Sequence, residues 1–287
     1  MTDYGHDLKF GTFLTPASSR VDDVVRLARL CDTLGYDLIS FQDHPYQPAL
    51  LDAPTLLAYV AALTWHAHLS ANVTNLPLRQ PVVIARSATT LDLLSGGRFE
   101  LGIGAGAFWD AIEAVGGRRL SPGQSVDALE EAVRIIRAVW AVAEPAGVRL
   151  QGDYYSVVGA KRGPTPPHPI SISIGAYKPR MLRLTGRVAD GWLPSLGRLA
   201  SPNDLGAMNE HVDEGAEEAG RSPRDIRRWL NIGVVDGQSE QWAEQLAGLT
   251  LEHGMSGFIV ASDDAGTLER FAHEVAPVVR AAVAAAR

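Results

Sequence analysis

The chain has 287 residues, of which 46% are hydrophobic and 21% charged, so it can bury a substantial core and has about the length of one α/β barrel. Its 33 acidic and 26 basic residues are scattered and give a net charge of -7, with no basic block that could follow a phosphate backbone. Nucleic acid is therefore not an expected partner. No stretch approaches the roughly 20 apolar residues of a membrane span, no targeting segment opens the sequence, and the single cysteine, Cys31, cannot form an internal disulfide. We expect a soluble cytoplasmic protein that does not bind membranes.

Short apolar runs alternate with helical patterns along the chain. The first run ends at Pro16, and the residues after it have apolar side chains at helical spacing. Residues 56–65, 81–94 and 125–142 are later segments with a helical pattern, and 148–158 is predicted as a hairpin. The runs predicted as strands are, in chain order, 10–14, 36–41, 69–73, 99–103, 170–174, 191–193, 229–235 and 257–261.

Eight nearly continuous apolar strands separated by helices favour a parallel sheet that is buried on both faces. Closing that sheet predicts an α/β fold of the (β/α)8 TIM-barrel type, formed by one domain over residues 1–287. An open, doubly wound sheet is the alternative.

Functional groups in such a barrel lie just after the strands. The second strand is followed by Asp43 and His44. His44 can exchange a proton near neutral pH, and Asp43 can orient or polarise a neighbouring group. A simple hydrogen bond at the strand end is the alternative interpretation of this pair.

The fourth strand ends in Gly102, Gly104 and Gly106, which can let the backbone approach an anionic ligand or can simply form a tight turn. Lys178 and Arg180 after the fifth strand favour a phosphate. His66 and His68 have the spacing of a metal pair but precede the third strand, which places them on the opposite face from His44. We expect them to be structural, and we expect no metal site.

Four segments in a fixed order resemble the bacterial luciferase-like monooxygenase superfamily, which includes flavin-dependent monooxygenases and enzymes that use the deazaflavin coenzyme F420. The resemblance covers almost the whole chain. It rests on Asp43-His44, on the run 70–81 with Asn72-Val73-Thr74 and Arg79, on the run 95–106 from Ser95 to Gly106, and on Ala189-Asp190-Gly191-Trp192.

The resemblance implies a non-prolyl cis peptide at Asn72-Val73 that supports the cofactor ring. It also implies that Asp43 and His44 face the reactive ring or the substrate, and that Arg79 braces the third βα loop. The residues that it implies for cofactor binding are Asn72, Val73, Gly104, Ala105, Gly106, Ala107, Phe108, Gly175, Ala176, Tyr177 and Lys178.

The Asp-His pair and the compact length look more like the F420-dependent branch, whose enzymes transfer a hydride between the deazaflavin and an organic substrate. Relatives in that branch often carry an acid where this chain has Ala107, which leaves His44 as the candidate for proton transfer. The alternatives are an FMN-dependent monooxygenase that uses oxygen and a flavin reductase partner, and a cofactor-binding protein without turnover. A metal-dependent hydrolase is disfavoured because few strand ends carry ligands. The resemblance also implies a homodimer and does not specify the substrate.

Overall fold

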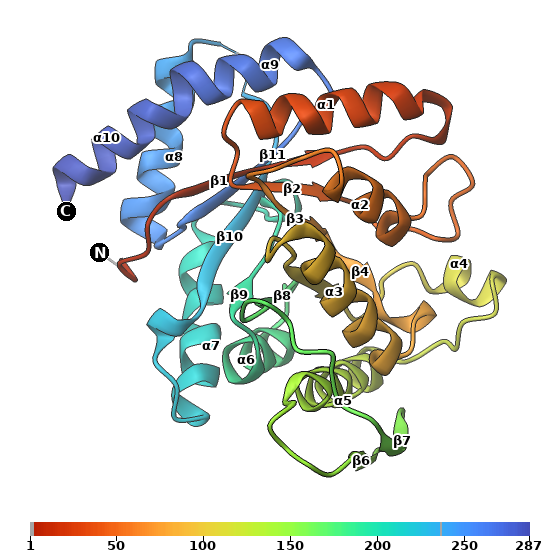
Figure 1. Cartoon of the computed structure of the whole chain (residues 1–287). Coiled ribbons are helices and arrows are strands. Elements are labelled where there is room, and N and C mark those ends of the chain that lie inside the picture. The colour runs from red at the N-terminus through yellow and green to blue at the C-terminus, as the bar shows by residue number, and fades with distance from the viewer. Residues whose placement is uncertain (1–2, 236) are drawn as a thin grey trace.

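The computed structural model describes residues 3–235 and 237–287, and its strands form the centre of the molecule with helices around them (Figure 1). The main sheet has the strand order β3-β2-β1-β11-β10-β9-β8-β5-β4, and every pairing within it is parallel. Its strands are β1 (Lys9–Leu14), β2 (Leu38–Phe41), β3 (His68–Ala71), β4 (Thr74–Asn75), β5 (Leu101–Gly104), β8 (Ile172–Ile174), β9 (Gly191–Trp192), β10 (Arg227–Ile232) and β11 (Gly257–Ala261).

The sheet closes into a barrel because β3 and β4 are two halves of the third strand. Between them lies the Asn72-Val73 peptide, which is cis as the family resemblance implies. β3 pairs with β2, β4 pairs with β5, and a parallel bridge from Leu69 to Phe99 joins the two edges. The prediction of a (β/α)8 barrel is therefore confirmed, with each predicted run forming one strand of the barrel.

The helices are amphipathic segments that cover the outside of the sheet (Figure 1). They are α1 (Val21–Thr33), α2 (Ala53–Ala61), α3 (Pro81–Ser95), α4 (Trp109–Ala114), α5 (Pro122–Trp140), α6 (Pro179–Val188), α7 (Asp204–Glu218), α8 (Ser239–His253), α9 (Ala265–Arg270) and α10 (Ala276–Ala286), with short helical turns at Ser18–Arg20, Leu76–Leu78, Leu196–Arg198, Pro223–Asp225 and Phe271–Val275. None of the helices in the described ranges is long and apolar enough to cross a membrane.

Side-chain caps move some helix ends away from their predicted positions. α2 begins before residue 56 because the Asp52 carboxylate accepts a hydrogen bond from the Thr55 amide, and it ends at Ala61 rather than at Trp65. The Trp65 amide and the next two amides instead donate to the buried carboxylate of Asp32. The apolar pattern alone does not contain this competing set of hydrogen bonds.

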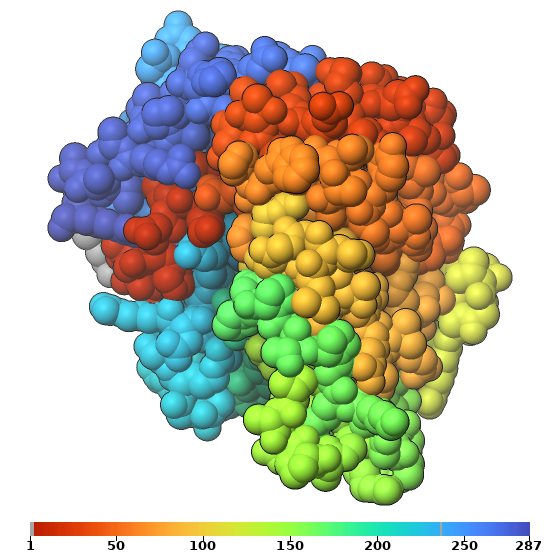
Figure 2. All heavy atoms as spheres, viewed as in Figure 1, coloured from red at the N-terminus to blue at the C-terminus, as the bar shows by residue number. Residues whose placement is uncertain are grey.

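The predicted hairpin is present as β6 (Val148–Gln151) and β7 (Ser156–Ala160), which pair antiparallel outside the barrel. In Figure 2 these residues, coloured green, stand out at one end of the molecule. The Glu131 carboxylate of α5 holds the turn of the hairpin, since it accepts hydrogen bonds from the amides of residues 153–155.

Candidate active site

A cavity of about 560 Å³ opens at the carboxyl-terminal ends of the strands. Every residue that the sequence predicts for catalysis or cofactor binding lies on its wall: Asp43, His44, Asn72, Val73, Gly104, Ala105, Gly106, Ala107, Phe108, Gly175, Ala176, Tyr177 and Lys178. The barrel therefore brings four strand ends that are far apart in the sequence to one site.

Asp43 holds two βα loops together at this end of the barrel. Its side chain is 1% exposed, and its Oδ2 accepts hydrogen bonds of 2.8 Å from the Asn75 amide and from the Arg79 guanidinium. Arg79 also bonds the Asp52 carboxylate at 2.8 Å, in agreement with the bracing role that the resemblance implies. Burial raises the pKa of Asp43, and Arg79 and the Asn75 amide partly oppose this rise.

His44 is half-buried and directs one edge of its ring to a polar partner. Its Nδ1 lies 2.6 Å from the Tyr46 hydroxyl, and its ring packs edge-on against Phe108 with 5.4 Å between ring centres. None of the residues in the described ranges forms a hydrogen bond with its Nε2. Burial lowers the pKa of His44, and Arg198 lowers it further against the opposing charge of Asp43. A neutral imidazole near neutral pH can accept a proton.

The bulge in the third strand is held from across the barrel. Asn72 Nδ2 donates to Asn231 Oδ1 at 2.6 Å, and Asn231 Nδ2 donates to the Ser195 hydroxyl at 3.2 Å. These bonds hold the Asn72 side chain, and the Val73 side chain lines the cavity beside Gly175. Asn231 also lines the cavity and is a functional candidate that was not predicted from the sequence. A polar side chain in the middle of the apolar run 229–235 was the available indication.

The glycines after the fourth strand have a structural role as well as a place on the cavity wall. A Cβ on Gly104 would lie 2.6 Å from Val73 Cγ2, so only glycine lets β5 seat against the bulge. Gly106 has a φ of 94°, in the left-handed region that favours glycine. The tight-turn interpretation is therefore confirmed, and the same turn places residues 104–108 on the cavity wall, while approach of this backbone to an anionic ligand stays a prediction.

The positive charges at the cavity differ in part from those expected. Lys178 lies at its wall, whereas Arg180 binds the Gly123 carbonyl and Asp127 on α5 and is not among the lining residues. Arg198 lines the cavity instead, with its guanidinium 5.5 Å from the centre of the Tyr177 ring. Among the residues of 3–235 and 237–287 that line the cavity, Asp43 is the one that carries a carboxylate.

The wall suits a planar, hydrogen-bonding cofactor with an anionic tail. Apolar contact comes from Val73 and Ala176, and positive charge comes from Lys178 and Arg198. Asp43 Oδ1 is buried without a hydrogen-bond partner among the described residues, as is the Oδ1 of Asn75, so both can accept hydrogen bonds from a bound molecule. These acceptor oxygens, cations and apolar contacts therefore fit a flavin-type ring and its tail.

Comparison with known proteins agrees with this geometry. A family model described as luciferase-like monooxygenase matches residues 8–285. An F420-dependent glucose-6-phosphate dehydrogenase of Kribbella flavida is 33% identical over 222 residues, which cover 74% of this chain and 64% of that protein. The chain thus spans less than two thirds of the length of this curated relative.

Two solved structures share the fold at low sequence identity. One, an F420-dependent secondary alcohol dehydrogenase in complex with an F420-acetone adduct, has a TM-score of 0.85 and 20% identity over 96% of this chain and 99% of its own. The other, the oxygenating constituent of 3,6-diketocamphane monooxygenase from Pseudomonas putida in complex with FMN, has a TM-score of 0.74 and 18% identity over 95% and 99%. The family model covers nearly the whole described chain, so this chain belongs to the luciferase-like monooxygenase family.

Proposed function

We propose that the protein is an F420-dependent oxidoreductase that transfers a hydride between the deazaflavin and a small organic alcohol or ketone. The observation that carries the proposal is the position of His44, whose Nε2 has no hydrogen-bond partner among the described residues and whose ring shares a cavity with the Asn72-Val73 bulge. The F420-dependent relative supports the choice of cofactor.

We assign the cofactor to three parts of the wall. Val73 and the bulge would support the ring, and the backbone of 104–108 and of 175–178 would hold the tail. Backbone amides of these two segments and the nearby charges of Lys178 and Arg198 would stabilise the anionic groups of that tail. The unpartnered oxygens of Asp43 and Asn75 would accept hydrogen bonds from the ring or the substrate.

A bound deazaflavin supplies a carbon that accepts a hydride from an alcohol or returns one to a ketone. In the oxidation, His44 Nε2 would take the proton from the substrate hydroxyl. The C–H bond of the alcohol carbon would break at the same time, so that the hydride leaves to the cofactor and the carbonyl forms. In the reduction, the same nitrogen would return the proton to the carbonyl oxygen. Tyr46, bonded to Nδ1, would hold the ring orientation, and the lowered pKa of His44 keeps the imidazole neutral and ready to accept.

The first experiment is a titration of the purified protein with F420 and, separately, with FMN, followed by ring absorbance and fluorescence. Tight and selective binding of F420 supports the proposal, and selective binding of FMN contradicts it. His44→Ala should bind F420 as the wild type does but lose turnover of secondary alcohols. His66→Gln, which changes an exposed histidine outside the cavity, is the matched control.

An FMN-dependent monooxygenase is the second candidate, since the same barrel holds FMN in the diketocamphane enzyme. Incorporation of labelled oxygen into a product, with a flavin reductase supplying reduced FMN, would favour it. A protein that binds the cofactor without turnover would leave F420 unreduced with every alcohol tested. One domain over residues 1–287 and a homodimer remain predictions, which limited proteolysis and light scattering can check.

A further inference from the structure

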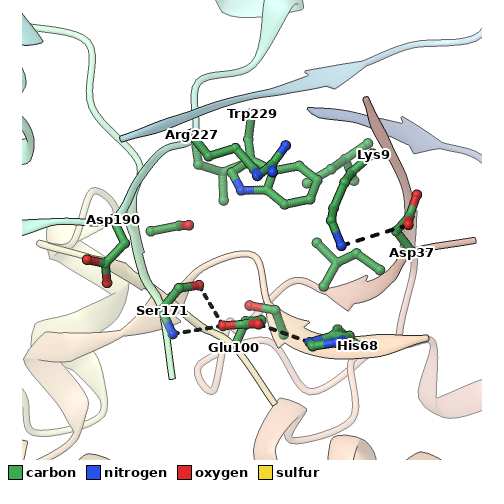
Figure 3. Close-up of a pocket in the computed structure, with 13 residues that line it drawn as sticks. Lys9, Asp37, His68, Glu100, Ser171, Asp190, Arg227 and Trp229 are labelled. Atoms are coloured by element: carbon green, nitrogen blue, oxygen red, sulfur yellow. Dashed lines mark hydrogen bonds and ion pairs between the residues drawn. The ribbon is translucent and has the colours of Figure 1, made fainter. Parts of the chain in front are cut away.

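A second cavity, of about 210 Å³, lies at the opposite end of the barrel (Figure 3). Its charged lining residues stand at the beginnings of strands or just before them, so it does not belong to the candidate active site. In Figure 3, Glu100 lies on one side of this cavity with His68 and Ser171 beside it, and Arg227 and Lys9 lie across from it. The proposed function makes no use of this end of the barrel.

His68, Glu100 and His168 form a cluster beside this cavity although they come from three different segments. His68 Nδ1 lies 2.9 Å and His168 Nε2 lies 3.4 Å from the same oxygen, Glu100 Oε1. One ligand atom from each residue lies within 4.8 Å of the other two. Two imidazole nitrogens and a carboxylate oxygen at such spacing are a common set of ligands for zinc and related divalent ions.

Two of the three residues, His168 and Glu100, are held by further hydrogen bonds on the side away from the cluster. The Asp92 carboxylate, whose side chain is completely buried, lies 2.8 Å from His168 Nδ1. Glu100 Oε2 accepts bonds from the Ser171 amide at 2.8 Å and from the Ser171 hydroxyl at 2.5 Å. A carboxylate behind a histidine and donors behind a carboxylate are the usual supports of metal ligands, because they fix the tautomer and the direction of the lone pairs.

The contact between His168 and Glu100 requires a positive charge. Because Asp92 accepts a hydrogen bond from Nδ1–H, neutral His168 presents the Nε2 lone pair toward Glu100 Oε1. Two acceptors that face each other at 3.4 Å repel unless a proton or a metal ion lies between them. Lys9 pairs with Asp37, and Arg227 donates to the carbonyl of Asp7, so neither cation is hydrogen-bonded at the His168–Glu100 contact.

The geometry points to a binding site for one zinc-class divalent cation, with His68 Nδ1, His168 Nε2 and a Glu100 carboxylate oxygen as ligands. The half-buried cluster borders the cavity at Glu100 and His68, which leaves room for a water molecule or a small anion as the fourth ligand. The ion would join the start of β3, the residue before β5 and the loop before β8, so its role is to clamp this end of the barrel.

The test uses the full chain, free of affinity tags, after dialysis against a chelator. Zinc is measured per chain by mass spectrometry after reloading, and Co²⁺ is titrated while its visible absorption is recorded. The variants are His68→Gln and His168→Gln, which each remove one ligand, and Asp92→Asn, which keeps all three ligands but changes the group behind His168. His66→Gln is the control, because it changes an exposed histidine two residues from His68.

We expect one equivalent of zinc per chain in the wild type and in His66→Gln, and loss of stoichiometric binding in both ligand variants. Asp92→Asn should bind about 10- to 100-fold more weakly. The intense visible band of four-coordinate Co²⁺ and a metal-dependent rise in Tm should follow the same order. Folded wild-type protein without stoichiometric zinc, or zinc content that is equal in wild type and His168→Gln, would overturn the proposal and identify the cluster as an ion pair with protonated histidine.

Discussion

Replacing Arg79 with methionine tests whether the candidate site depends on the buried Asp43–Arg79 pair. The Asp43 side chain is 1% exposed and that of Arg79 is 17% exposed, and the two bond at 2.8 Å. Breaking such a pair from one side costs about 3–5 kcal/mol in the free energy of unfolding, because a charge is left buried. We expect the low end, about 3 kcal/mol, since the Asn75 amide still donates to Asp43.

Asp52→Asn is the matched control, because it removes the charge of the exposed partner on the other arm of Arg79. The Asp52 side chain is 49% exposed, so its ion pair contributes at most about 1 kcal/mol. Urea unfolding followed by tryptophan fluorescence measures both losses at neutral pH. Equal losses in the two variants would refute the argument that burial makes the Asp43 pair different.

The pH dependence gives an independent check on the cause of this loss. Burial already raises the pKa of Asp43 above its unfolded value, and removing Arg79 raises it further. A carboxyl group with a raised folded pKa opposes folding at pH values above its unfolded pKa of about 3.9 and has no such effect below it. The difference in the free energy of unfolding between Arg79→Met and wild type should therefore narrow as the pH falls toward 4. Adding Asp43→Asn to Arg79→Met should recover part of the lost stability at neutral pH. If the difference in the free energy of unfolding stays constant with pH, a buried charge is not the cause of the lost stability.

Three further predictions concern the active-site wall. His44→Gln should lower kcat about 10²- to 10⁴-fold with little change in F420 affinity, and the acid limb of the wild-type pH–rate profile should lie below pH 6.5 and disappear in the variant. Arg198→Gln removes a charge that lowers the pKa of His44, so in stopped-flow assays the acid limb should move to higher pH. Gly104→Ala, whose Cβ would lie 2.6 Å from Val73, should lower the free energy of unfolding by about 1–3 kcal/mol and weaken F420 binding. The control is Gly248→Ala in α8, whose Cβ would contact no other atom within 4 Å, and it should raise the free energy of unfolding by about 0.5–1 kcal/mol.

The outcomes that contradict these predictions differ. Full turnover in His44→Gln would remove the histidine from the mechanism, even if F420 binds. An acid limb that stays in place in Arg198→Gln would mean that the guanidinium does not act on His44. Equal effects of the two glycine substitutions would show that β5 does not need to pack closely against the bulge at Val73.

Several properties followed from local sequence alone. Apolar runs of strand length, each followed by a helical pattern, were enough to predict the barrel, because a parallel strand needs apolar side chains on both faces and a long crossover. The barrel then places the ends of its strands together, so residues after the second, third, fourth and fifth strands could be assigned to one wall before any contact was known. All predicted site residues line the same cavity for this reason.

The tertiary structure decided which side chains point into each end of the barrel. Arg198 replaces Arg180 at the cavity wall, and Asn231 bonds Asn72 across the barrel, because strand register and the start of a helix set side-chain direction. His68, Glu100 and His168 meet across 100 residues of sequence for the same reason. The sequence determined the order of the strands and the end of the barrel at which each strand end lies. Closure of the sheet determined which side chains contact one another there, because neighbours in a barrel are set by packing rather than by distance along the chain.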